Sequence, residues 1–275
     1  FRSSGGRLRA DMRITGTLDS PAIYGQASLE DGMVWVQGLD APIRKLSGGI
    51  RFSERQLLLE GLRGSLGGGR VVITGEASVG RSPGEAPGLD RYALSMRMQE
   101  VPLSPVRGMT VGLGGMAQLR WQEGQRLPKL TGTVRLRRGR YTRPFKLGIT
   151  PTLKSLSGSQ RAGVELYDPE DDRVAIDLRV VDDAPLHIQN NLLDATLRIQ
   201  DREQPFRIVG TDQRVGVVGS LAFEQGVMRF RNTEFNIEQG NVRFDDQHRV
   251  HPRFDLRAST EIKRTGEFSG PRWSI

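Results

Sequence analysis

The residues best suited to metal chemistry are two histidines next to two aspartates. His248 and His251 follow Asp245 and Asp246, and imidazole and carboxylate groups are ordinary zinc ligands. Residues three apart in a strand point to opposite faces of the sheet, however, and Pro252 comes next in the chain. We therefore expect this segment to be a hairpin loop and not a metal site.

A second acidic group surrounds a proline and consists of Asp168, Glu170, Asp171 and Asp172. It lacks the ligand spacing and the glycine of a calcium-binding loop, so a solvated turn is expected. His187 alternates with apolar neighbours and is expected to face solvent.

Three kinds of catalytic or cofactor site are absent from the sequence. The glycine run that ends at Arg70 is followed by a strand pattern and lacks the Lys-Ser/Thr of a phosphate loop. No order of Ser, His and Asp suggests a nucleophile, and the chain has no cysteine. We expect no enzymatic activity, no cofactor and no metal.

Basic residues dominate the charge, with a formal net charge of +8 and a pI near 10.4. They are mostly arginine and are scattered along the chain, on the polar side of alternating segments, which disfavours nucleic-acid binding. The tightest cluster is Arg135, Arg137, Arg138, Arg140 and Arg143. A solvated strand face is expected there, and contact with anionic lipid headgroups is the alternative.

Alternation of apolar and polar residues is the main structural signal. Leu8 to Ile14 and Val174 to Val180 each alternate strictly, as a strand with one apolar face does. No segment has a convincing helical stripe, no apolar run approaches the ~20 residues of a membrane-spanning helix, and turn signals recur about every 8 to 12 residues. The sequence therefore predicts an all-β, mainly antiparallel fold.

An internal repeat refines that prediction. The pattern G-x3-[LF]-x2-G occurs at Gly25–Gly32, Gly132–Gly139 and Gly219–Gly226. The repeat glycines, and Gly240 with them, are expected in turns between stacked hairpins. The repeat glycines are Gly25, Gly32, Gly132, Gly139, Gly219 and Gly226. Stacked repeats need no central core, so about 20 strands would give a sheet roughly 100 Å long.

A sheet that long must hide its apolar face. It can pack against a second sheet as a sandwich, or it can curl around an apolar groove. Large rings are the natural filler of a wide interior, and the aromatic content of 6% is low, which favours the groove slightly.

Three segments resemble a known family. Ala184–Gln200 and Val218–Ser259 resemble the C-terminal domain of the TamB family, within the AsmA-like group, with Gly219, Gly226 and Gly240 in register. Leu57–Ser78 resembles the repeats that precede that domain.

The resemblance implies an elongated antiparallel sheet curled into a U-shaped groove with an apolar lumen, the β-taco. It divides the chain into two β repeats, at residues 1–90 and 91–165, and a TamB-like domain at residues 166–275. The three parts are expected to form one continuous β structure. It also implies a periplasmic bridge for outer-membrane biogenesis, attached to the inner membrane through an N-terminal helix outside this sequence. Such a bridge conducts phospholipid or supports outer-membrane protein assembly, with a TamA-like barrel as partner through a region outside this chain.

The groove is expected to be lined by the apolar residues of the TamB-like segment. These are Leu186, Ile188, Leu197, Ile199, Leu221, Phe223, Met228, Phe230, Phe235, Ile237, Val242, Phe244, Phe254 and Leu256. Two alternatives stay open, a scaffold or chaperone that binds client β-strands at its sheet edge, and a packed structural sandwich.

Overall fold

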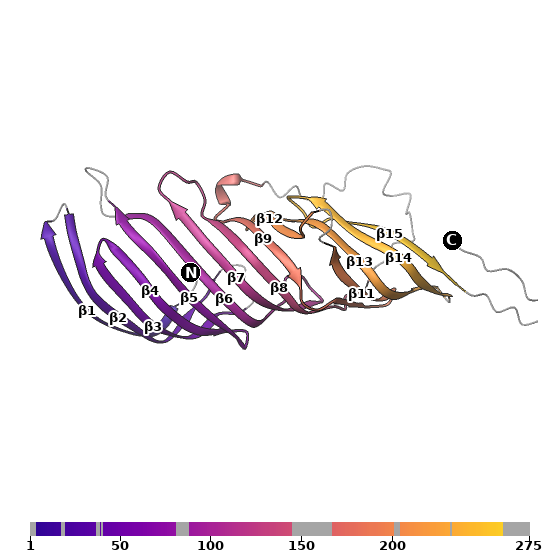
Figure 1. Cartoon of the computed structure of the whole chain (residues 1–275), viewed down its shortest axis with the longest axis horizontal. Helices are drawn as coiled ribbons and strands as arrows, with labels where there is room; N and C mark the ends of the chain where they lie inside the picture. Colours follow the sequence, from indigo (N-terminus) through magenta and orange to yellow (C-terminus); the bar gives the residue numbers. More distant parts are fainter. Residues whose placement is uncertain are drawn as a thin grey trace, which may run out of the picture.

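A single long sheet makes up almost all of the chain (Figure 1). The computed structural model describes residues 4–17, 20–36, 39, 41–80, 88–144, 167–200, 204–231 and 233–260. Fifteen strands run through these residues, with one short 3-10 helix, η2 (Pro169–Asp171), and no α-helix among them. The all-β prediction is confirmed, and the estimate of about 20 strands was too high for the described part.

The strands are long, and eight of them precede η2. They are β1 (Ser4–Thr17), β2 (Ser20–Val34), β3 (Ile43–Glu54), β4 (Gln56–Leu66), β5 (Gly69–Gly80), β6 (Gly88–Leu103), β7 (Met109–Gln122) and β8 (Lys129–Tyr141). After η2 come β9 (Ala175–Asp182), β10 (Leu186–Gln189), β11 (Leu193–Gln200), β12 (Arg207–Thr211), β13 (Val215–Phe230), β14 (Thr233–Asp246) and β15 (Pro252–Ser259).

The first eight strands form an antiparallel series in chain order. The order changes after β8, because β9 and β10 both run parallel to it, β9 beside its first half and β10 beside its end. The amides of Asp183 and Ala184 donate to the carbonyl of Leu136 between these two strands, at 2.9 and 3.2 Å. β9 and β10 thus form one interrupted strand, and β11 and β12 form the next one, antiparallel to it.

The far end of the sheet is antiparallel again. β13 pairs with both β11 and β12, and β14 and β15 complete the sheet. Figure 1 shows the strands following one another along the long axis of the molecule, from indigo β1 to yellow β15. All described strands belong to one sheet, while the division into three segments stays a prediction.

One face of this sheet is buried although no second sheet exists in the described ranges. Val101, Leu66 and Val71 are 0%, 1% and 1% exposed. A flat single sheet would leave such side chains in water, so the sheet curls over its own apolar face. Register shifts interrupt every pair of neighbouring strands from β1 to β8. Bulges bend the strand that carries them, which accounts for the curl.

The repeat glycines are not in turns, and this prediction was wrong. Gly25, Gly32, Gly132, Gly139, Gly219, Gly226 and Gly240 all lie inside β2, β8, β13 or β14. At Gly25 and Gly132 φ is +137° and +144°, and a Cβ would lie 2.1 and 2.2 Å from the carbonyl oxygens of Asp11 and Met116. Only glycine allows the neighbouring strand to come this close.

Candidate functional site

All fourteen predicted lining residues lie on one face of the sheet. The register pairs Leu186 with Leu197, and Ile199 with Leu221. The same row continues from Leu221 to Val242 and then to Phe254. Paired residues point to the same side, so their side chains form continuous rows across β10, β11, β13, β14 and β15. We call this side of the sheet the apolar face.

The fourteen residues differ in how deeply they are buried. Leu197 and Val242 are 1% and 3% exposed, whereas Phe254 on the last strand is 50% exposed. Ten of them belong to one cluster: Ile188, Leu197, Leu221 and Val242, with Leu186, Ile199, Phe223, Met228, Ile237 and Phe244 packed against them. Phe230, Phe235, Phe254 and Leu256 lie on the same face outside this cluster.

A second, larger cluster occupies the apolar face of the first eight strands, and the predicted lining omitted it. Its buried members are Ile43, Leu46, Leu62, Leu66, Val71, Met98, Val101, Ala117 and Val134. Strict alternation, as at Met96 and Met98, was the signal that could have found them.

The two clusters share one continuous surface. A row of paired residues runs from Leu103 through Val111 and Gly139 to Leu186 and Leu197. Leu103 packs on the first cluster, and Leu197 belongs to the second. The apolar face therefore extends over the full length of the sheet.

Burial increases from one end to the other along three strands of the first cluster. On β4, Leu57 and Leu59 are half-buried, while Leu62 and Leu66 are 7% and 1% exposed. The same change runs along β3, from Phe52 and Ile50 to Leu46 and Ile43, and along β6, from Tyr92 and Leu94 to Met98 and Val101.

This change defines two sides of the groove. We call the strand ends at Ile43, Leu66, Gly69, Leu103 and Tyr141 the closed end, and those at Glu54, Gln56, Gly80, Gly88, Gln122 and Lys129 the open end. Leu39 and Ala41, from the segment that enters β3, pack against the cluster and help to cover the closed end. The apolar face is therefore a groove that opens along one side.

Aromatic rings lie on the apolar face near the open end. Tyr92 and Trp121 stack with ring centroids 5.9 Å apart, and the indole Nε1 of Trp121 donates to the carbonyl of Gln125 at 2.8 Å. Burial raises the pKa of Tyr92 above its ordinary value. Rings with one polar group suit a boundary between apolar surface and water.

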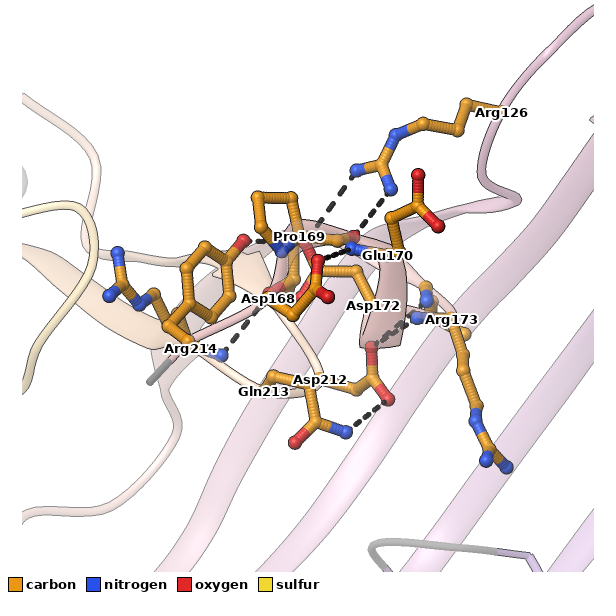
Figure 2. Close-up of polar contacts among 12 residues, drawn as sticks. Arg126, Asp168, Pro169, Glu170, Asp172, Arg173, Asp212, Gln213 and Arg214 are labelled. Carbon is orange, nitrogen blue, oxygen red and sulfur yellow. Dashed lines mark hydrogen bonds and ion pairs between the residues drawn. The ribbon is translucent and has the colours of Figure 1, made fainter. Parts of the chain in front are cut away.

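A polar cluster fastens the chain where it returns to the sheet at β9 (Figure 2). Asp172 is 5% exposed and accepts hydrogen bonds from Tyr167 at 2.6 Å and from Thr211 at 2.7 Å. The guanidinium of Arg126 lies 3.6 Å from the same carboxylate. The hydrogen bond from Tyr167 lowers the pKa of Asp172 most, and the hydrogen bond from Thr211 and the charge of Arg126 lower it further, although burial opposes this.

The prediction of a solvated turn holds for three of the four acidic residues. Asp168, Glu170 and Asp171 are exposed, and the Asp168 carboxylate caps η2 by accepting from the Glu170 amide at 2.9 Å. For Asp172 the prediction was wrong, because its partner Thr211 comes from a strand 39 residues away.

The histidines lie where the sequence predicted. His248 and His251 are in the exposed connection between β14 and β15, and His187 is exposed, with Nδ1 3.4 Å from the Thr196 hydroxyl. Within the described ranges no three His, Cys, Asp or Glu residues form a group that could hold a metal ion. Nor does this part of the chain contain a helix long and apolar enough to cross a membrane.

Comparison with known protein families identifies this chain by a family model. The model of a family described as the TamB C-terminal domain matches residues 60–272, more than half of the chain. Neither a curated protein nor a solved structure matches. The matched residues run from β4 to beyond β15 and so include all of the second cluster and most of the first, whose members Ile43 and Leu46 precede the match.

Proposed function

Because the chain belongs to the TamB C-terminal domain family, we propose that its apolar groove conducts phospholipid between the inner and outer membranes. The family is a non-enzymatic transport and assembly module of the periplasm, and membership links this chain to outer-membrane biogenesis. The curled single sheet agrees with the β-taco fold of the family. The cargo and the route are our proposal.

The physical requirement for such transport is a long apolar path. A two-chain phospholipid in water exposes roughly 30 methylene groups at about 0.8 kcal/mol each, or about 25 kcal/mol. A carrier must therefore cover the acyl chains at every step. It must also bind them with similar strength at each position, since a deep local site would trap the lipid.

The observation that carries the proposal is the unbroken row structure of the apolar face. One row of paired residues crosses nine strands and contains no charged side chain. From β1 to β9 it consists of Ala10, Ala27, Ile50, Leu59, Gly75, Leu94, Leu119, Leu130 and Ile176. Six of these side chains are only half-buried, and so leave apolar surface for an acyl chain: Ile50, Leu59, Leu94, Leu119, Leu130 and Ile176. No single position stands out as a trap.

The test measures lipid bound to the purified chain by extraction and mass spectrometry. Leu57→Glu and Leu119→Glu place carboxylates on the apolar face and should strip the bound phospholipid. Leu58→Glu is the matched control, because Leu58 is 42% exposed on the opposite face of the same strand. Retention of lipid by both apolar-face variants would reject the proposal.

A scaffold for client β-strands is the second candidate, and the two edges of the sheet favour it. Among the described strands β1 pairs only with β2, and β15 only with β14. An unpaired edge can accept a further strand. Proline substitution in β15 should abolish client capture and leave lipid binding intact if the edge and the groove act independently. A TamA-like barrel is the proposed outer-membrane partner, and no described residue is assigned to that contact.

A further inference from the structure

Arginines gather on the polar face of the sheet, behind the closed end of the groove. We define the arginine stripe as Arg44 on β3, Arg63 on β4, Arg70 on β5, Arg97 on β6, and Arg135, Arg137, Arg138 and Arg140 on β8. All eight are exposed. Most of them alternate with residues of the apolar face, as Arg70 does between Gly69 and Val71, so their side chains point away from the groove. Arg137 and Arg138 are consecutive and both exposed, at the register shift between β7 and β8.

The register places these residues on neighbouring rows. Arg44 pairs with Ser65, which pairs with Arg70. Arg63 pairs with Val72, which pairs with Arg97. Six strands at about 4.8 Å spacing make the stripe about 24 Å wide, several times the Debye length of about 8 Å at physiological salt.

Few carboxylates neutralise the stripe. Asp183 lies 3.2 Å from Arg135 and 3.8 Å from Arg137. The other six members form no ion pair with a described residue.

Several charges elsewhere on the polar face are paired. Arg51 pairs with Glu60, and Lys129 and Arg207 both pair with Asp177. A face that served only to keep the chain soluble would mix both signs in this way throughout. The stripe differs because its like charges repel one another unless an external anion is present.

We propose that the arginine stripe docks the chain on the phosphate groups of an anionic phospholipid bilayer. Guanidinium groups bind phosphate through two parallel hydrogen bonds, and a dispersed set of them suits a fluid surface of headgroups. A protein partner would need a buried aromatic or aliphatic anchor. The positions between the arginines carry Ser65, Val72, Gln99, Gly114, Met116 and Thr133. None of these is aromatic, and Met116, 43% exposed beside Arg97, is the one large apolar side chain among them.

Docking through this face would leave the groove free. The stripe lies on the opposite face from the apolar rows and towards the closed end, so the open end stays clear of the membrane surface. The proposal concerns a surface separate from the groove, and it does not depend on lipid transport.

The test is co-sedimentation of the full chain with vesicles of phosphatidylcholine, with or without phosphatidylglycerol. We expect binding only to the anionic vesicles, weakened by salt. Replacing Arg63, Arg70, Arg97 and Arg138 by Gln should weaken it by at least about tenfold, since each basic residue near an anionic surface contributes measurably.

The matched control removes the same charge from arginines that have acidic partners: Arg9, Arg51, Arg229 and Arg253. This variant should bind anionic vesicles nearly as well as the wild type. Equal binding to neutral vesicles, no binding to either, or equal loss in both variants would overturn the proposal. If the true partner of the stripe is an acidic protein, the stripe variant should bind anionic vesicles as well as the wild type does. Bound lipid in the groove is measured in parallel and should not change.

Discussion

Leu66→Ala tests whether the sheet encloses its own apolar face. Leu66 lies at the end of β4, is 1% exposed and belongs to the buried cluster of the first eight strands. Removing three carbons from a fully buried leucine lowers the free energy of unfolding by about 2–5 kcal/mol, because the loss of buried apolar surface and the cavity left behind both destabilise the folded state. For a chain of this size that corresponds to a fall in Tm of roughly 5–15 °C.

The matched control is Leu58→Ala on the same strand. Leu58 is 42% exposed and points to the polar face, so its truncation should change stability by less than about 0.5 kcal/mol. Urea unfolding followed by tryptophan fluorescence measures both variants. Equal destabilisation, or a negligible effect at Leu66, would refute the closed end of the groove.

Other positions give further tests. Gly132→Ala should lower the free energy of unfolding in urea by about 1–3 kcal/mol more than Gly124→Ala does. Both glycines have positive φ, but a Cβ at 132 would lie 2.2 Å from a carbonyl oxygen of the neighbouring strand, whereas nothing lies within 4 Å of a Cβ at 124. Equal losses would argue against the close approach of β7 and β8. Asp172→Asn should lower stability at neutral pH. Since the folded state lowers the pKa of Asp172 from 3.8, its contribution is complete above that value and is lost as the pH falls through the lowered pKa. The two urea midpoints should therefore converge below about pH 4, and a gap that persists unchanged there would contradict the assignment.

Alternation along the chain was enough to predict the strands and to select one face. A strand repeats every two residues, so Leu197, Leu221 and Val242 could be assigned to one side before their pairing was known. The register places them in one row or in neighbouring rows. Local pattern was sufficient here because each strand carries its own signal.

Features that depend on distant residues were not predictable in this way. Gly25 and Gly132 look like turn residues in sequence, and only the adjacent strand shows why they are needed inside β2 and β8. Asp172 resembles its exposed neighbours until β12 brings Thr211 beside it. The parallel step from β8 to β9 likewise has no local signature.

The central claim is that one face of the sheet holds acyl chains. It is tested most directly by placing a photoreactive amino acid at four successive positions of β4 and measuring phospholipid adducts by mass spectrometry. Leu57 and Leu59 belong to the apolar face, whereas Leu58 and Glu60 belong to the polar face. We predict adducts at 57 and 59 and none at 58 and 60. Equal labelling at all four positions, or none at 57 and 59, would contradict the account.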